Sequence, residues 1–570
     1  MMCRLVLLVL GATLLAACAP SSADRSAQIA AQGTQSTIPK ILTVAVNKEP
    51  STIQGFTGGG ASAGRANTEA SFVHNQLVVR DADDALRPQL AVQVPSIEAG
   101  TWRINADASM DMTWKIRQGA KWHDGAPFSS DDLLFTLAVY RDRELPHPYT
   151  QLTRLMESAT ATDKSTFIVH WGKADARAAE GLGISPLPRH LLEEAYQRGD
   201  KEAFSSNSRF TDDFVGLGPY RVVRWERGSH MELARSENYF LGKAPLDSVV
   251  VRYITDPNTM MANVLSGAVD VVLPPSIDLD AALELRHQWA DTGNLVHIGP
   301  LPAFLYLEIQ YRPELARPAL GFTNRLVRQA FLLGTNRQAL ADVMTGGASP
   351  VADSWLRPGT PLRRDAEAAI PQYPYDVTRA QQLLAQAGWT RGSDGSLVNQ
   401  TGERFSAEIW ANTKAVVAGD KQASIIAQDW KALGADFSIH PIPANLANDR
   451  EYGSKYPTTS ITRSPDDNFL DRLDSRFIAG PENDWAGRNK MAYTNPRVDA
   501  LLDRVAIAVD TRDRAVVSRE LAQELLSEAA FIPLYWEAHP VVLVASVRPL
   551  IEPNNAGWNA FEWDKRSPTR

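Results

Sequence analysis

The length of the chain is the feature that most limits what it can fold into. With 570 residues, it exceeds the roughly 250–300 residues beyond which a single hydrophobic core stops growing. The composition is that of an ordinary globular protein, with 44% hydrophobic and 22% charged residues, so long disordered tracts do not account for the length. We therefore expect about two to four domains or subdomains.

The first 20 residues, MMCRLVLLVLGATLLAACAP, have the pattern of an export signal. Arg4 provides a positively charged start, Leu5–Leu15 is an apolar run, and Ala16-Ala17 are small. The segment Leu15–Cys18, LAAC, resembles the bacterial lipobox, in which the cysteine is lipidated and becomes the new N-terminus. The alternative is an ordinary signal peptide followed by a chance cysteine.

The cysteine count favours lipidation over this alternative. The chain has two cysteines, and the other one, Cys3, lies within the segment that would be removed. We predict a lipoprotein signal peptide at residues 1–17, a lipid anchor on Cys18, and a flexible tether of small and polar residues at 18–37. With one cysteine left, a disulfide within the chain is excluded. The protein is therefore expected outside the cytoplasm, in a periplasm or at a cell surface, anchored to a membrane by lipid.

Charge and histidine spacing restrict the partners. The net charge of −8 and the pI near 5.8 disfavour binding to nucleic acid or to anionic lipid surfaces. The ten histidines show no His-x₃-His spacing or Cys/His cluster, so neither a metal site nor a cofactor is expected. No apolar run of 18 residues follows the N-terminal segment, so no later membrane span is expected. We expect a monomer.

Two segments near the N-terminus have apparent functional motifs that we interpret structurally. Ile41–Val46, ILTVAV, predicts a buried first strand. The glycine-rich segment that follows, Gly55–Arg65, lacks the Gly-Lys-Ser/Thr ending of a phosphate loop, which leaves a mobile loop near a cleft as the preferred interpretation.

A second apparent motif lies in residues 114–137, WKIRQGAKWHDGAPFSSDDLLFTL, where a histidine, acids and a glycine occur together. The alternation around Trp114 predicts a strand, and Asp124-Gly125 predicts a turn. Ser129 and Asp132 have the spacing of a helix N-cap and its partner. Every polar residue then has a local structural role, so we predict a strand–turn–helix unit rather than a catalytic site.

This unit resembles a signature of the family 5 extracellular solute-binding proteins, the peptide and nickel receptors of ABC importers. Further segments resemble that family in the same order along the chain, from about residue 40 to the end. They are Gly216–Asp256 (GLGPYRVVRWERG and onward), Asn263–Val272 (NVLSGAVDVV), Asn324–Pro350 (NRLVRQAFLLGTNRQAL and onward), Tyr373–Trp389 (YPYDVTRAQQLLAQAGW) and Tyr493–Trp536 (YTNPRVDALLDRV and onward). Each segment alone is weak evidence, whereas their shared order is strong.

The resemblance implies an α/β fold of the periplasmic-binding-protein type (type II, cluster C). In this architecture two lobes close on a ligand like a Venus flytrap, and an extra domain is attached to the first lobe. The first lobe would comprise residues 38–70, 215–300 and 530–570, the extra domain 71–214, and the second lobe 300–530.

The resemblance also implies a mechanism. The chain would cross between the lobes near Gly299–Pro302 and again near residues 525–535, and the prolines of the first crossing limit bending there to a few dihedral angles. A ligand that contacts both lobes stabilises the closed state. The closed protein would then deliver a small-molecule or peptide-like ligand to ABC permease subunits, with no catalytic residue required.

Candidate ligand contacts follow from the same resemblance and from strand periodicity. Ala303–Tyr311, AFLYLEIQY, is expected to be a strand that starts at the cleft, with Phe304, Tyr306 and Glu308 on one face; this face either borders the cleft or is buried core. Tyr149 resembles in position the loop by which the extra domain reaches the ligand in peptide receptors. Three further candidates, each of which could equally belong to the core or to a lobe surface, are Trp355, Trp410 and Trp485.

One segment departs from the family pattern. Peptide receptors carry a motif close to Trp-x-Ala-Asp-Tyr-x-x-Pro, whose aspartate pairs with the free α-amine of the peptide. The corresponding stretch, Thr458–Leu470, has Thr462 at the aspartate position and Arg463 after it. A free-amine peptide would thus lose its charged anchor, unless Asp466-Asp467 replace it. We hypothesise a ligand that is not an ordinary peptide or is gripped differently: Arg463 or Arg450 could meet a carboxylate or phosphate, or simply form a solvated rim.

Rival functions have less support. The chain has no Gly-x-Ser-x-Gly or His-Glu-x-x-His motif and no cysteine beyond the proposed anchor after processing, so we do not expect an enzyme. An exported sensory receptor or a hydrolase at the same surface location remains the alternative.

Overall fold

The computed structural model describes residues 39–53, 70–142, 144–145, 155–180, 184–412, 416, 418–465 and 469–566. Several sequence predictions lie outside these residues: the signal peptide, Cys18, the tether, the glycine-rich loop, Tyr149 and the pair Asp466-Asp467. Within the described residues, no helix has both the length and the apolar character needed to cross a membrane.

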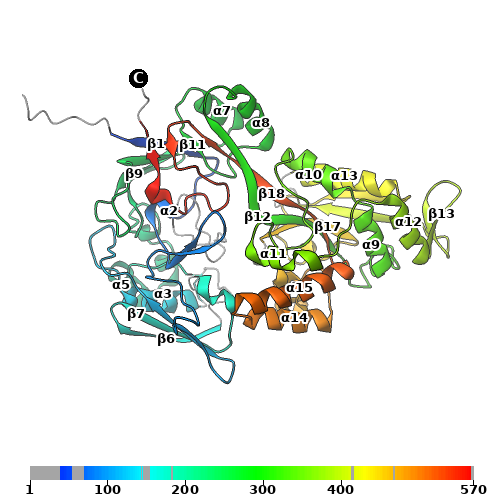
Figure 1. Cartoon of the computed structure of the whole chain (residues 1–570), viewed down its shortest axis with the longest axis horizontal. Helices are drawn as coiled ribbons and strands as arrows, with labels where there is room; N and C mark the ends of the chain where they lie inside the picture. Colours follow the sequence, from blue (N-terminus) through cyan, green and yellow to red (C-terminus); the bar gives the residue numbers. More distant parts are fainter. Residues whose placement is uncertain are drawn as a thin grey trace, which may run out of the picture. The chain divides into compact units, whose positions relative to one another are not determined.

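A mixed ten-stranded sheet forms the framework of the described chain (Figure 1). In spatial order, its strands are β16 (Asp436–Pro441), β15 (Ser406–Ala411), β17 (Thr459–Pro465), β12 (Leu295–Ile309), β18 (Ile532–Leu543), β11 (Val271–Val272), β1 (Ile41–Val46), β10 (Ser248–Tyr253), β9 (His230–Arg235) and β8 (Tyr220–Glu226). The two long strands β12 and β18 lie side by side in the middle of this order. We call the strands from β11 to β8 the first half of the sheet and those from β16 to β17 the second half. Each half has its own helices and core, as expected for a two-lobe α/β protein.

The predicted first strand is confirmed as β1, with the bounds Ile41–Val46. It pairs in parallel with β10 on one side and with β11 on the other. Leu42, Val44 and Ala45 have no exposed surface. A strand with parallel neighbours is covered on both faces, which explains why its sequence is apolar almost throughout.

The predicted strand–turn–helix unit is also confirmed. Strand β5 (Met110–Lys115) leads through a turn with Gly125 at φ 92° into helix α3 (Ser130–Arg141). The backbone N–H of Ser129 donates to Asp132 Oδ2 at 2.8 Å. His123 is held by the backbone, since its Nδ1 accepts from Gly216 N and its Nε2 lies 3.1 Å from Gly218 O. Burial lowers the pKa of His123 to about 4, so its ring is neutral near pH 7.

Strand β5 belongs to a separate four-stranded antiparallel sheet with a core of its own. The order of this sheet is β4 (Trp102–Ile104), β5, β7 (Thr166–Trp171) and β6 (Met156–Asp163). Elements in the same part of the chain are α2 (Ala70–Val73), β2 (Val78–Arg80), β3 (Leu86–Pro88), η1 (Ala176–Glu180), α5 (Arg189–Gln197) and α6 (Lys201–Ser205). On the first half of the large sheet, α7 (Pro257–Leu265) and α8 (Leu279–Gln288) pack over β1, β11 and β12.

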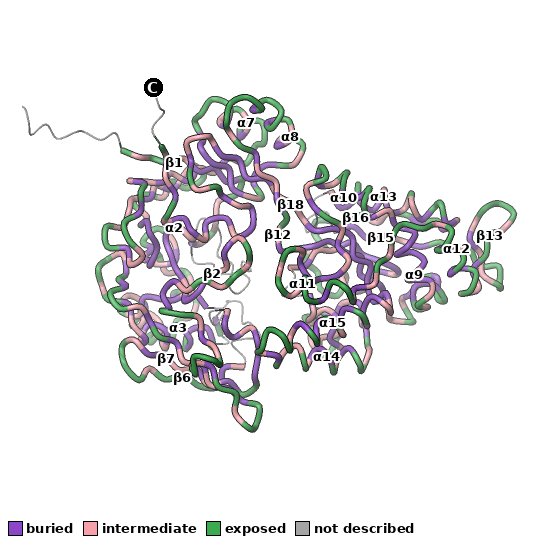
Figure 2. The backbone as a smooth tube through the Cα atoms, in the orientation of Figure 1, coloured by how far each residue is buried: buried purple, intermediate pink, exposed green. Residues whose placement is uncertain are grey.

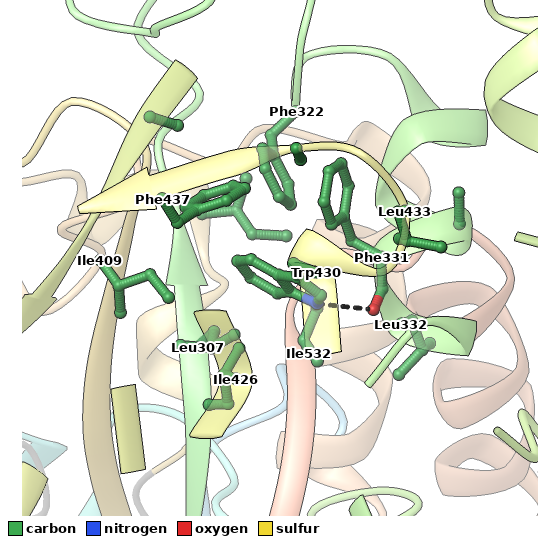
Figure 3. Packing of buried hydrophobic residues seen from close by; sticks show 14 of the residues in the cluster. Leu307, Phe322, Phe331, Leu332, Ile409, Ile426, Trp430, Leu433, Phe437 and Ile532 are labelled. Carbon is green, nitrogen blue, oxygen red and sulfur yellow. Dashed lines mark hydrogen bonds between the residues drawn. The ribbon is translucent and has the colours of Figure 1, made fainter. Parts of the chain in front are cut away.

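The other half of the sheet is covered on one face by an aromatic core (Figure 3). Trp430 is fully buried in this core, and its indole N–H donates to the carbonyl of Phe331 at 3.2 Å. Leu307 and Ile532, from the two long strands, pack into the same core. Its helices and hairpin are α9 (Arg325–Leu333), α10 (Arg337–Thr345), α12 (Val377–Gln386), α13 (Gly419–Lys431), β13 (Trp389–Arg391) and β14 (Leu397–Asn399).

A second cluster covers the opposite face of this half. It includes α11 (Pro361–Ala366), α14 (Pro496–Ile507) and α15 (Thr511–Ser527). Two short strands near the C-terminus, β19 (Val547–Arg548) and β20 (Asp564–Lys565), pair with each other.

Strands β12 and β18 join the two halves, and the pairing and burial of these strands are irregular at one level. Their pairing is interrupted between Pro300 and Phe304. At this level Pro300 of β12 is exposed, and β12 is buried throughout from Pro302 onward, whereas Glu537–His539 of β18 is half-buried between buried residues on both sides (Figure 2). The irregular level of β12 falls within Gly299–Pro302, the predicted first crossing. On β18 the half-buried residues lie after 525–535, the predicted second crossing, which spans the end of α15 and the start of β18. The lobe boundaries stay predictions.

Candidate ligand-binding site

The two halves of the protein also meet away from the crossing strands, through a chain of charged side chains. Arg357 directly follows the buried residues Trp355 and Leu356 of the second half. Its Nη2 lies 3.0 Å from Oδ2 of Asp84, in the turn between β2 and β3. Asp84 is also 3.2 Å from Arg80, which is 2.5 Å from Glu180. The four side chains are between 7% and 17% exposed. This set, the Arg357 network, holds the β2–β3 turn against the second half.

A second contact links η1 to the C-terminal helices. The guanidinium of Arg514 on α15 lies 3.5 Å from the carbonyl of Ala176 on η1. Lys173 Nζ lies 3.4 Å from Asp503 Oδ1 on α14. Both contacts are polar and long, so each contributes little to holding the two sides together.

Between these elements lies a cavity of about 420 Å³, which we call the interlobe cavity. One wall belongs to the segment around β7 and η1, and the other to the segments around α14 and residues 470–477. Its lining residues are Leu155, Lys173, Ala174, Asp175, Ala176, Arg177, Leu470, Asp471, Asp474, Arg476, Phe477, Leu502, Asp503, Val505, Ala506 and Arg514. A space of this size suits a small organic molecule.

A second group of charged side chains lies on β17 and β18, at the level where β12 and β18 cross between the halves. Arg463 on β17 makes a two-pronged ion pair with Glu537 on β18, with N–O distances of 2.9 and 2.7 Å. The Arg463 side chain is 40% exposed and that of Glu537 is 14% exposed. Partial burial alone would lower the pKa of Arg463, but the hydrogen bonds to Glu537 outweigh it and raise the pKa. An anionic ligand would therefore have to compete with Glu537 for this guanidinium.

The predicted strand residues lie in the core in this structure. Phe304 and Tyr306 have no exposed surface, and Glu308 is 3% exposed. Phe304 and Tyr306 pack against Phe469, with ring centroids 5.0 Å apart in both pairs. Glu308 Oε1 lies 3.3 Å from Arg472 Nη1. Of the two interpretations that the sequence left open, this placement corresponds to the buried core; a role in ligand binding stays a prediction.

The three predicted tryptophans lie in different surroundings. Trp355 is 4% exposed, in the same cluster as Phe304. Trp410 is 7% exposed and stacks on His440, with ring centroids 4.5 Å apart. Trp485 is half-buried, with a lysine and an arginine within 6 Å of its ring.

The predicted residues that the structure describes therefore lie in several different surroundings, and their role in ligand binding stays a prediction. Thr462 is half-buried on β17, where it pairs with Tyr306. None of the predicted residues that the structure describes lines the interlobe cavity. The cavity-lining residues were missed because they come from short 3₁₀ turns and helix ends that have no motif or period. Their one signal in the sequence is the charge density of DRLDSR, residues 471–476.

Among the described residues, no group of three or more His, Cys, Asp or Glu side chains could hold a metal ion.

Comparison with known proteins identifies related chains. The sequence model of the bacterial extracellular solute-binding proteins, family 5 Middle, matches residues 93–477. Heme-binding protein A of Haemophilus influenzae is 25% identical over 508 residues, which cover 83% of both chains. Oligopeptide-binding protein AppA of Bacillus subtilis is 22% identical over 443 residues, covering 75% of this chain and 76% of AppA.

A solved structure extends this similarity to the fold. NikZ from Campylobacter jejuni, in complex with Ni(L-His), matches with a TM-score of 0.69 at 22% identity, over 93% of this chain and 100% of that one. The two-lobe α/β fold expected from the sequence is therefore confirmed.

Proposed function

The chain belongs to the family 5 bacterial extracellular solute-binding proteins, and we propose that it is the lipid-anchored substrate-binding subunit of an ABC importer. In this role it captures a small organic solute, peptide-like or otherwise, by closure of its lobes and delivers it to a membrane permease. Members of the family act outside the cytoplasm and bind solutes rather than transform them. The anchor would be the lipid on Cys18.

The observation that carries this proposal is the shared change in β12 and β18 at the crossing. Two continuous strands join two separately packed cores; their pairing is interrupted after Pro300, which is exposed, and Glu537–His539 opposite it is half-buried. Such a pair of connections allows rotation about a few dihedral angles while each core stays rigid. Opening would separate the walls of the interlobe cavity, so a ligand between them favours closure.

The energy that closure requires is within reach of a small ligand. Shifting a two-state protein from about 1% to about 99% closed needs roughly 5.5 kcal/mol of differential binding. Of the polar contacts between the two sides, the short and buried Arg357–Asp84 pair contributes more to closure than the long contacts of Arg514 and Lys173. The ligand therefore has to supply only the part of the closure free energy that these contacts do not provide.

The ligand class is narrowed by two features. The resemblance of Thr458–Leu470 to the peptide-receptor motif puts Thr462 at the place of the amine-binding aspartate, unless Asp466 or Asp467 replaces it. Arg463 after it is already paired with Glu537. We infer that a plain free-amine peptide has no charged anchor at this position.

The test is to identify and return the natural ligand. Ligand retained by the purified protein would be extracted after mild denaturation and identified by mass spectrometry. Adding it to the ligand-free protein should reduce the radius of gyration in small-angle scattering and bind with a 1:1 stoichiometry in calorimetry. An unchanged scattering profile, or turnover of the compound by the protein, would count against solute capture.

A further inference from the structure

The interlobe cavity offers a ligand contacts from both sides of the protein. Asp175–Arg177 belongs to the side of η1, whereas Leu470–Asp471 and Leu502–Ala506 belong to the other side. A molecule in this space therefore bridges the two lobes. What it binds depends on which polar groups of the wall still lack a partner.

Most charged groups of the wall neutralise one another. Arg177 donates to both carboxylate oxygens of Asp175, at 3.1 and 2.8 Å. Arg476 does the same with Asp474, at 2.8 and 2.6 Å, and its third nitrogen lies 2.8 Å from Asp503. These groups form closed pairs that leave little capacity for a ligand charge.

Two further bases belong to the wall: Lys173, whose Nζ lies 3.4 Å from Asp503 Oδ1, and Arg514, which is satisfied by the backbone. Arg514 donates from Nε to the carbonyl of Ala508 at 2.9 Å, and its Nη2 lies 3.5 Å from the carbonyls of Ala176 and Val509. Its guanidinium is thus directed at the helix start and at η1. An anionic ligand would have to displace an existing partner at each base of the described lining, including Asp503 at Lys173.

Asp471 differs from the other acids of the described lining because it has no ion pair within the wall. Its Oδ2 accepts a single long hydrogen bond from Arg488 Nη1, at 3.3 Å. Arg488 lies outside the lining and its side chain is 55% exposed, whereas that of Asp471 is 17% exposed. Burial raises the pKa of Asp471 and outweighs the nearby positive charges of Arg177 and Arg488, which lower it. A carboxylate in this position favours a cation.

The rest of the wall is apolar. Leu155, Leu470, Phe477, Leu502 and Val505 line the space next to Asp471. We propose that the interlobe cavity binds the apolar body of an organic cation whose ammonium or guanidinium group pairs with Asp471. This assignment rests on the proposed function, because it names the ligand class that the closing lobes would retain.

The experiment compares two probes of similar shape and opposite charge. Phenethylamine and 3-phenylpropanoate would be titrated calorimetrically into the ligand-free full-length protein. Phenethylamine should bind at least tenfold more tightly. Asp471→Asn removes the charge with almost no change in shape and should weaken phenethylamine binding at least tenfold. Ala506→Phe fills the cavity without touching the carboxylate and should abolish binding of both probes.

The control is Asp484→Asn, which changes an exposed aspartate outside the lining and should leave both affinities unchanged. Thermal melts establish that each variant is folded. Equal affinity of the wild-type protein for the two probes, no phenethylamine binding, or amine preference retained in Asp471→Asn would overturn the assignment. If the natural ligand still closes both variants with wild-type affinity, solute capture stands and the cavity assignment falls.

Discussion

The Arg357 network provides a direct measure of how much the protein itself contributes to closure. We consider Arg357→Met, which keeps the length and apolar stem of the side chain and removes its charge. Asp84 remains 3.2 Å from Arg80 in this variant, so its carboxylate keeps a partner. The substitution therefore removes the link between the two sides without leaving an isolated buried acid.

The size of the effect follows from the geometry. At the 3.0 Å separation of Arg357 and Asp84, Coulomb's law with an effective dielectric constant near 20 gives about 5.5 kcal/mol of attraction. The cost of removing both ions from water on closure offsets most of this. We expect a net loss of about 1–2 kcal/mol of closed-state stability, which is a factor of about 5–30 in the closed population.

Calorimetry and scattering should report this loss together. The dissociation constant of the co-purified ligand should rise by roughly 5- to 30-fold, and the unliganded variant should have a larger radius of gyration than the wild-type protein. Arg364→Met is the matched control, because Arg364 is an exposed arginine of the same segment and does not reach Asp84. An affinity and a scattering profile equal to those of the wild-type protein would refute the assignment of Arg357 as a closing contact.

Three further predictions concern the anchor, the core and the response to acid. Cys18→Ala should abolish incorporation of labelled palmitate and release the protein from the membrane fraction; labelling equal to that of the wild-type protein would exclude Cys18 as the anchor. Leu307→Ala removes a fully buried side chain and should lower the free energy of unfolding in urea by about 3 kcal/mol; a loss below about 1 kcal/mol would contradict the packing. His123 has its pKa lowered by burial from 6.5 to about 4, so the unfolded chain binds the extra proton, and stability should fall by about 1.4 kcal/mol per pH unit between pH 6.5 and 4. His123→Gln should reduce this slope in pH-dependent denaturation, and an unchanged slope would argue against a neutral buried ring.

The sequence predicted those parts of the fold that depend on local patterns. The strand Ile41–Val46 was recognisable because a buried parallel strand is apolar along its whole length, and its observed bounds are the predicted ones. The unit from Trp114 to helix α3 was recognisable because Asp-Gly fixes a turn and Ser129 caps a helix. These signals are short-range, so no knowledge of the tertiary structure was needed to interpret them.

The second crossing shows where local patterns stop being sufficient. Residues 525–535 join helix α15 to β18, and the apolar residues there fit either element. The observed crossing near Glu537 is marked by a loss of burial, which depends on how two lobes are arranged and not on the residues nearby. The crossing on β18, unlike the proline-containing one on β12, therefore has no local signature in the sequence.

The charged residues of the candidate site show the same limit of prediction from local sequence. Arg463 was singled out by its place after Thr462, but what it can bind is decided by Glu537, which is 74 positions later in the chain. Asp471 was not singled out, although it is the cavity-lining acid without an ion pair inside the wall. The sequence does not show this difference, because the other acids are paired by side chains such as Arg476 whose positions depend on the fold. The availability of a charge for a ligand depends on what the fold leaves unpaired. Residue type and spacing identify the charges, and the tertiary structure determines which of them a solute can use.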